Sequence, residues 1–225
     1  LENANIAYKG VIKQNDLPTG CCNILVSPDG ERTMATHIGI GSQLHPDELT
    51  EDSLQGIDHV YMESYLWDHD LTKQTLKKVG KIAKIMNIET SLSLSDPFCV
   101  DRHRDELKAF IEEYVDLVFC NFDEAKMFAQ SETMADVSAF FQSFGKKIAM
   151  TASAEGAYYF HGETVTHQPA QKIEQVIDTT GAGDNFAAGF LDQYLSDKTI
   201  DEALAQGNAR AGEVIQQLGP RIKRH

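Results

Sequence analysis

The stretch of sequence that decides the fold is Val176-Ile177-Asp178-Thr179-Thr180-Gly181-Ala182-Gly183-Asp184, where two glycines stand between a strand-like run and an amphipathic helix. Glycine permits tight backbone geometry, and the free N–H groups of a new helix point at whatever lies before it. Such a turn suits an anion. Asp184 falls in the first helical turn, where a carboxylate can accept a proton from a hydroxyl group that attacks phosphorus. The alternative is a plain turn, in which Asp184 only complements the helix dipole.

The helix after this turn is expected at about 182–195. Aromatic residues recur at every fourth position along it, at Phe186, Phe190 and Tyr194, which predicts a wide buried stripe. A second helix, at about 200–218, is rich in small residues. We expect both helices to pack on a sheet.

Upstream of the turn, short apolar strands alternate with helical stretches. The strands are expected at 59–62, 88–94, 117–120, 148–151, 157–160 and 164–168, with helices at 71–86 and near 107–114. This alternation predicts βαβ units and a mostly parallel sheet covered on both faces, with the last strands as an antiparallel edge.

A hairpin is predicted before the sheet, over residues 20–37. Two β-runs, 21–26 and 32–36, are separated by Pro28-Asp29-Gly30. Because the sequence has no internal repeat and no Pro/Gly/Ser-rich linker, one α/β domain is expected, with the hairpin as an appendage.

Composition limits the partners. The chain has 20 Lys and Arg against 34 Asp and Glu, a net charge of −14, which repels nucleic acid and anionic membranes. The four cysteines lack Cys-x-x-Cys spacing and are expected to be reduced, buried thiols, and no apolar run approaches the length of a membrane span. A cytoplasmic protein is therefore predicted. The chain opens at Leu1 rather than at Met, so we expect it to start partway into a longer protein.

The string Asp-Thr-x-Gly-Ala-Gly-Asp at 178–184 resembles the C-terminal signature of the ribokinase (PfkB) family of sugar and nucleoside kinases. The resemblance implies a ribokinase-like three-layer α/β/α fold with a small β lid. It also implies that Asp184 is the catalytic base, and that Gly181, Ala182 and Gly183 form the anion hole for the transferring phosphoryl group. Asp178 and Thr180 match positions that hold an activating monovalent cation such as K⁺ in several members, although Asp178 can equally cap the turn.

A second match to the family is Asn121-Phe122-Asp123-Glu124, after the strand at 117–120. It is similar to the Asn-x-x-Glu motif, in which Asn121 and Glu124 would orient Mg²⁺ and its waters around the phosphates. Read alone, Asn121 is a helix N-cap and Glu124 its capping-box partner.

Two further segments resemble nucleotide contacts of the family. Residues 151–156 resemble a Thr-x-Gly-x-x-Gly loop, so Thr151 and Gly156 are expected to contact ATP, but Ser153 stands where glycine is usual. Asn208 lies in the small-residue helix, a region that lines the adenine pocket in the family. The alternative for this helix is that its small residues only allow close helix packing.

The resemblance covers the chain from the hairpin onward, so residues 1–225 are interpreted as the C-terminal larger part of one ribokinase-like kinase domain. The hairpin at 20–37 would be part of the lid that excludes water. The segment 61–68 is similar to the adenosine-kinase-like branch, with a packed Trp67 as the simpler explanation.

The function expected from this resemblance is ATP-dependent transfer of phosphate to a hydroxyl of a nucleoside or, second, of a sugar such as ribose or fructose. The cofactors are ATP, Mg²⁺ and, in some members, K⁺. The partner is a small-molecule acceptor, without nucleic acid or membrane, and a homodimer is left open. The other two hypotheses are a non-catalytic nucleotide- or sugar-binding member of the family and an α/β domain outside it.

Overall fold

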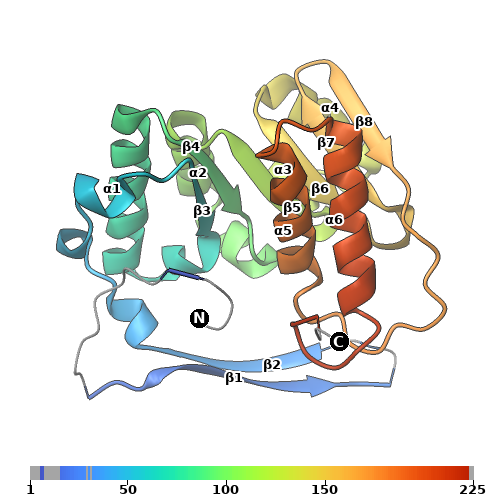
Figure 1. Ribbon diagram of the computed structural model, residues 1–225, viewed down its shortest axis with the longest axis horizontal. Coiled ribbons are helices and arrows are strands. Elements are labelled where there is room, and N and C mark those ends of the chain that lie inside the picture. The colour runs from blue at the N-terminus through green and yellow to red at the C-terminus, as the bar shows by residue number, and fades with distance from the viewer. Residues whose placement is uncertain (1–5, 8–15, 29, 31, 223–225) are drawn as a thin grey trace.

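The computed structural model describes residues 6–7, 16–28, 30 and 32–222 (Figure 1). Its central sheet has the strand order β3-β4-β5-β6-β7-β8. These strands are β3 (His59–Glu63), β4 (Glu89–Ser93), β5 (Leu117–Asn121), β6 (Lys147–Thr151), β7 (Ala157–His161) and β8 (Thr164–Gln168). The first four are parallel, and β7 and β8 continue the sheet as antiparallel strands. The predicted mixed sheet and its antiparallel edge are confirmed.

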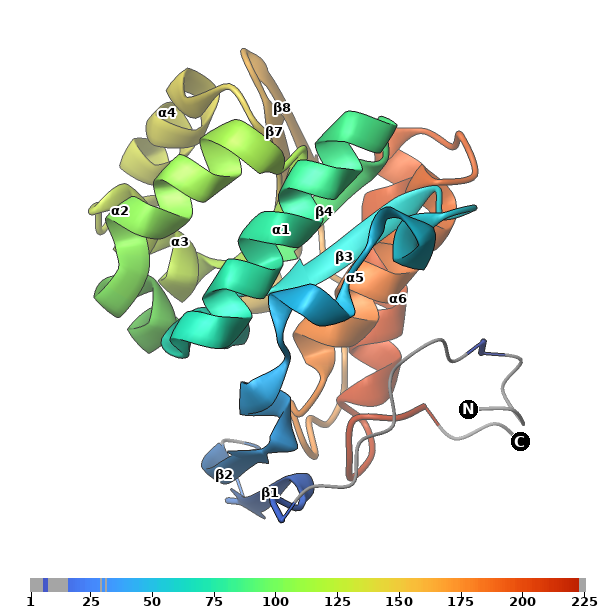
Figure 2. The same cartoon turned by 90° about the vertical axis from the view of Figure 1, so that its left-hand side faces the viewer.

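Six α-helices cover this sheet in the described part of the chain. They are α1 (Asp70–Met86), α2 (Pro97–Tyr114), α3 (Phe122–Ala129), α4 (Met134–Phe144), α5 (Ala182–Tyr194) and α6 (Ile200–Val214). Short 3₁₀ helices, η2 (Ile40–Gln43), η3 (Pro46–Glu48), η4 (Glu51–Leu54), η5 (Ser64–Asp68) and η6 (Ser153–Glu155), lie in the connections. Figure 2 shows α1 and α2 on one side of the sheet and α5 and α6 on the other.

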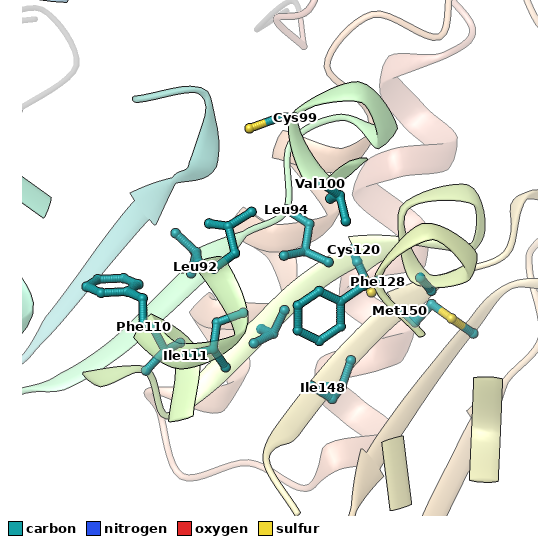
Figure 3. Packing of buried hydrophobic residues seen from close by; sticks show 14 of the residues in the cluster. Leu92, Leu94, Cys99, Val100, Phe110, Ile111, Cys120, Phe128, Ile148 and Met150 are labelled. Atoms are coloured by element: carbon teal, nitrogen blue, oxygen red, sulfur yellow. The ribbon is translucent and has the colours of Figure 1, made fainter. Parts of the chain in front are cut away.

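Each face of the sheet has its own apolar core. One core joins α1–α4 to the sheet and includes Leu92, Ile111 and Phe128, which Figure 3 shows packed together. The other core joins α5 and α6 to the opposite face, through Phe119, Phe186, Phe190 and neighbouring side chains. The aromatic stripe predicted on α5 is therefore buried, and the fold has the three expected layers.

Two helices differ from the sequence prediction: one begins earlier than expected, and one was not predicted. The helix expected near 107–114 begins ten residues earlier, since Pro97 occupies its first turn and Asp96 accepts the N–H groups of Phe98 and Cys99 at 2.7 and 3.0 Å. Helix α4 has no counterpart in the prediction, although Thr133 caps it through the Asp136 N–H. Both starts carry an ordinary N-cap residue.

The predicted hairpin is confirmed as β1 (Thr19–Val26) and β2 (Arg32–Gly39), although Asp29 of its predicted turn lies outside the described residues. In Figures 1 and 2 the hairpin lies across one edge of the molecule, below the central sheet. Most of its residues are exposed. Cys21 and Cys22 are among them, so the expectation of four buried thiols is wrong for these two.

Candidate active site

The predicted site residues gather at the carboxyl edge of the sheet, the edge at which the parallel strands end. Glu63 ends β3, Asn121 ends β5 and Thr151 ends β6. Asp184 lies in the first turn of α5, and two residues further along this helix the Phe186 ring lies 6.4 Å from the ring of Phe119, which is two residues before the end of β5. The prediction that Asn121 and Asp184 share one edge is confirmed. Ligands of open α/β sheets bind at this edge.

The glycine turn before α5 has a left-handed first residue. Gly181 has φ 76° and is the N-cap of α5, and a Cβ added there would lie 2.7 Å from the Cβ of Pro220. Glycine is therefore required for both conformation and space. The run before the turn is a loop rather than the predicted strand, because the N–H of Ile177 donates to the carbonyl of Ile215 at 2.8 Å, and not to a neighbouring strand.

The start of α5 is open to solvent. Gly183 and Asp184 are exposed, and a Cβ added at Gly183 would meet no atom within 4 Å. No side chain in the described part of the chain caps this helix. The Ala182 N–H donates to the Thr179 carbonyl at 3.2 Å, whereas the N–H groups of Gly183 and Asp184 have no hydrogen-bond partner among the described residues. With the Asp184 carboxylate, these two N–H groups lie at the exposed start of the helix, which can accommodate an anion beside a proton acceptor.

Asp178 and Thr180 are buried under the turn. Asp178 is 3% exposed, and one of its oxygens accepts hydrogen bonds from the N–H and the hydroxyl of Thr180. The other oxygen accepts from the Gly219 N–H at 2.8 Å. Burial opposes ionisation, but these hydrogen bonds outweigh it and hold the pKa of Asp178 below its ordinary value. The carboxylate caps the turn, as the alternative prediction had it.

Asn121 and Glu124 form a reciprocal capping box at the start of α3. Asn121 accepts the Glu124 N–H at 2.8 Å, and the Glu124 carboxylate accepts the backbone N–H and the side-chain amide of Asn121 at 3.0 and 2.7 Å. Glu124 is 5% exposed. Its burial raises its pKa to about 7, and the charges of Asp96 and Glu63 add to that rise. The structure thus shows the capping function, and the Mg²⁺ function stays a prediction.

Two carboxylates at this edge were not singled out from the sequence. Glu63 accepts the Ser95 hydroxyl at 2.7 Å, and burial is the main cause of its raised pKa. Asp96 caps α2 and raises the pKa of Glu124. Glu63 is the last residue of parallel strand β3, and Asp96 follows the end of β4 by three residues. These positions are the signal that could have identified them.

The predicted nucleotide loop, Thr151 to Gly156, is a tight turn between β6 and β7. Ser153 has φ 49°, in the left-handed region. A glycine at this position would adopt that conformation without steric cost, so the usual glycine is explained by the backbone alone. Gly156 is buried with φ 100°, and a Cβ there would lie 2.2 Å from the carbonyl oxygen of Gln168. Packing therefore explains Gly156 by itself. ATP contacts at Thr151, Ser153 and Gly156 stay predictions.

Asn208 and the small residues of α6 serve packing. The Asn208 amide donates to the Gln168 carbonyl at 2.9 Å, which ties α6 to the segment after β8. A Cβ added at Gly207 would lie 2.7 Å from the Phe186 ring, so α5 and α6 pack closely there. The packing alternative is confirmed for Gly207, and an adenine contact at Asn208 stays a prediction.

The segment 61–68 is dominated by a packed tryptophan. Trp67 is fully buried, and its ring centroid lies 4.8 Å from that of Phe110. The simpler explanation of this segment is therefore confirmed. The described residues contain no group of three or more His, Cys, Asp or Glu placed to hold a metal ion directly. None of the helices described has the length and apolar character that a membrane crossing requires.

The hairpin contacts the signature turn. The Thr179 hydroxyl donates to the Gly30 carbonyl at 3.2 Å, and a Cβ added at Gly30 would lie 3.1 Å from the Val176 side chain. The turn of the hairpin is thus close to the loop that precedes the anion site.

Comparisons with known proteins agree with this arrangement. The sequence matches the family described as pfkB family carbohydrate kinase over residues 1–224. It is 26% identical to adenosine kinase from Schizophyllum commune over 91% of this chain and 65% of that protein.

Two solved structures are also similar. The crystal structure of adenosine kinase from Sinorhizobium meliloti is 38% identical with a TM-score of 0.87, over 91% of this chain and 63% of that one. The structure of a probable sugar kinase protein from Rhizobium etli is 36% identical with a TM-score of 0.88, over 92% of this chain and 64% of that one. The chain thus spans less than two thirds of the length of these relatives.

Proposed function

Because this chain belongs to the pfkB family of carbohydrate kinases, we propose that it carries the nucleotide-binding and catalytic part of an ATP-dependent phosphotransferase. The acceptor is a hydroxyl group of a nucleoside, adenosine first. The observation that carries the proposal is the open start of α5, where exposed Gly183 and Asp184 share one space with uncapped N–H groups.

In the proposed reaction, Asp184 accepts the proton of the acceptor hydroxyl as its oxygen attacks the γ-phosphorus of ATP. The bond from the γ-phosphorus to the bridging oxygen breaks, and ADP leaves. The turn formed by Gly181, Ala182 and Gly183 presents the N–H groups of Gly183 and Asp184, which stabilise the charge on the transferring phosphoryl group. Thr151, Ser153, Gly156 and Asn208 are proposed to contact the nucleotide.

The carboxyl edge suits Mg²⁺ that arrives with ATP. Glu63, Asp96 and Glu124 carry carboxylate oxygens, the ligand type that Mg²⁺ prefers. Burial is the main cause of the raised pKa of Glu124, and the charges of Asp96 and Glu63 add to it, so a divalent cation would relieve that repulsion. Because both oxygens of Glu124 already accept hydrogen bonds from Asn121, these two residues would hold Mg²⁺ through its waters. When bound with ATP, the cation would neutralise negative charge on the phosphates. Asp178 and Thr180 are proposed as the site of K⁺, although Asp178 is already compensated by hydrogen bonds.

The hairpin of β1 and β2 is proposed as part of a lid. Its contact with the signature turn, from Thr179 to the Gly30 carbonyl, supports closure over the carboxyl edge. A closed lid would exclude water, which otherwise competes as phosphoryl acceptor.

Two observations bear on the choice of acceptor. The similarity to the adenosine kinases from Schizophyllum commune and Sinorhizobium meliloti favours adenosine. The similarity to the probable sugar kinase protein from Rhizobium etli favours a sugar as the second candidate.

An acceptor screen tests this proposal. The complete protein, with ATP and Mg²⁺, is incubated with adenosine, cytidine, ribose or fructose, and ADP release is recorded. We expect release above the acceptor-free rate with adenosine. ATP binding without release for any acceptor would favour a non-catalytic member of the family, and absence of nucleotide binding would reject the proposal.

A further inference from the structure

Asn185, the residue after Asp184, joins two separate segments through one side-chain amide. Its Nδ2 lies 2.8 Å from the carbonyl oxygen of Gly181 and 3.0 Å from that of Pro220. The backbone N–H of Asn185 also donates to Gly181, at 2.9 Å. An amide nitrogen carries two hydrogens, so both contacts can form at once.

These bonds complete a clamp on the glycine turn. At the beginning of the turn, the Asp178 carboxylate accepts the Gly219 N–H at 2.8 Å. In the middle, Gly181 lies against Pro220, where a Cβ would approach to 2.7 Å. At the end, Asn185 binds the Pro220 carbonyl. The segment 219–220 therefore holds the turn at three successive points.

The turn needs such a clamp because of its glycines. Glycine has more conformational freedom than any other residue, and Gly181 holds a left-handed conformation immediately before α5. A shift in its peptide plane would tilt the N–H groups of the first helical turn. Stabilising a developing charge requires those donors to be fixed before the reaction.

We infer that Asn185 is a positioning residue, which fixes the turn so that the N–H groups of Gly183 and Asp184 converge on the γ-phosphoryl group of ATP. This inference rests on the proposed function. ADP lacks the γ-phosphoryl group, so Asn185 should matter for ATP and not for ADP.

A second amide in the molecule provides a matched control. Gln142, on α4, donates to the carbonyl and hydroxyl of Ser138, four residues before it, at 3.3 and 3.0 Å. Asn185 likewise bonds the carbonyl four residues before it, but only Asn185 also bonds Pro220. Both of the Gln142 hydrogen bonds stay within α4, which packs on the other face of the sheet from α5.

The experiment measures the affinities for ATP and for ADP by calorimetry, with Mg²⁺, in the complete protein. Asn185→Leu keeps a similar volume and removes the donors, and Gln142→Leu is the control. Loss of the clamp should weaken ATP binding about tenfold, the size of one hydrogen bond. ADP affinity should change less than about twofold, and Gln142→Leu should keep the ATP-to-ADP ratio of the parent.

The outcomes separate this inference from the proposed function. An unchanged ratio in Asn185→Leu overturns the role of Asn185, whereas a parent that binds neither nucleotide rejects the proposed function and the inference with it. If Asn185→Leu shows no cooperative unfolding, the same two affinities are measured for Asn185→Ser. The serine hydroxyl can still bond Gly181 but is too short to reach Pro220, so the ATP-to-ADP affinity ratio should fall, and an unchanged ratio overturns the role of Asn185. If neither variant folds, Asn185 is a folding residue and the inference is overturned.

Discussion

The central sheet has an amino edge, where its parallel strands begin, and a carboxyl edge, where they end. The charged side chains at these two edges have different neighbours. At the amino edge, Glu89 lies 2.8 Å from the Lys147 ammonium and accepts the Tyr194 hydroxyl at 2.6 Å. At the carboxyl edge, Glu63 and Glu124 have carboxylate neighbours instead of cations. Burial opposes ionisation at both edges. Salt-bridge partners outweigh it for Glu89, whose pKa is lowered, whereas the pKa values of Glu63 and Glu124 are raised.

We interpret the paired charges of the amino edge as serving the fold, and the carboxylates of the carboxyl edge as suited to a ligand. Paired charges at the amino edge stabilise the sheet by themselves. The carboxylates at the carboxyl edge have no cationic partner that offsets their burial and mutual repulsion, so their ionised forms destabilise the free protein. A cation or a polar ligand would reduce this repulsion. Each of the following substitutions tests one side of this comparison.

The largest effect is expected at Asp184, in catalysis rather than in stability. Asp184→Asn keeps the shape of the side chain but removes the proton acceptor, so kcat of the complete protein should fall about 10²- to 10⁴-fold. ATP affinity should hold or rise, because one negative charge near the phosphates is gone. Steady-state turnover and calorimetric ATP binding measure the two effects.

Asp192→Asn is the matched control for Asp184→Asn, since Asp192 is exposed on the same helix, near its other end. It should leave turnover unchanged. Parent-like turnover in Asp184→Asn would contradict the proposed catalytic function of Asp184. Loss of folding would instead indicate that Asp184 is needed for the structure of the helix start.

Glu124→Gln should stabilise the protein at alkaline pH. The folded pKa of about 7 lies above the ordinary value of 4.5, so this carboxyl contributes stability at low pH that is lost as pH rises through about 7. Glutamine keeps one oxygen that can accept the backbone N–H of Asn121, gives up the hydrogen bond from the Asn121 side-chain amide, and removes the pH-dependent loss because it does not ionise. The gain at about pH 8.5 should be about 1–3 kcal/mol in the free energy of unfolding, from the size of the pKa change, and should shrink toward about pH 5.

Glu202→Gln is the control for this gain. Glu202 forms the equivalent capping box with Thr199 at the start of α6, but it is exposed and its pKa is lowered by the hydrogen bonds from Thr199. Urea unfolding at both pH values should show no gain for Glu202→Gln. Equal behaviour of the two variants would mean that carboxylate crowding at the carboxyl edge is energetically unimportant.

Much of this comparison could be predicted from sequence. Strand periodicity located the whole sheet, and the glycine turn located Asp184 at its carboxyl edge. The clamp could not be predicted, because Asn185 and Pro220 are brought together only by tertiary packing. Helix α4 was missed although it could have been predicted, because Met134, Val137, Phe141 and Phe144 recur at the three- and four-residue spacing of a helix face. Its cap, Thr133, is easily interpreted as a loop residue.

Lys147→Met should destabilise the fold by about 1–2 kcal/mol, a loss kept small by the partial exposure of the ion pair. The substitution keeps the apolar stem but leaves Glu89 without its cation, while Tyr194 still donates to it. Lys126→Met is the control, because Lys126 pairs with exposed Asp123 on the surface of α3 and should change the stability little. Thermal unfolding at neutral pH compares the two variants. Equal losses of stability would contradict the view that the ion pair at the amino edge stabilises the fold more than an exposed ion pair does.

The smallest effect is expected from His59, a titratable group of the amino edge that lacks full compensation. Its Nε2 lies 2.8 Å from the Ser91 hydroxyl, whereas the buried Nδ1 has no hydrogen-bond partner in the described residues and lies 4.0 Å from Glu89. Burial lowers the pKa of His59, against the opposing charges of Glu89 and Asp116, and Lys147 lowers it further. A folded pKa below the ordinary value of 6.5 means that His59 contributes stability above pH 6.5, which is lost as pH falls toward the folded pKa.

His59→Gln should abolish this loss, since an amide can still bond Ser91 but does not titrate. The opposite slope of Glu124 overlaps the same pH range, so both proteins in the comparison carry Glu124→Gln. Between about pH 6.5 and 5, the free energy of unfolding should fall more steeply when His59 is retained than when it is replaced, by less than about 1 kcal/mol. If the free energy of unfolding changes equally with pH in both proteins, the prediction is contradicted. Glu89 would then compensate the protonated ring, and His59 would not lack a charged partner at the amino edge.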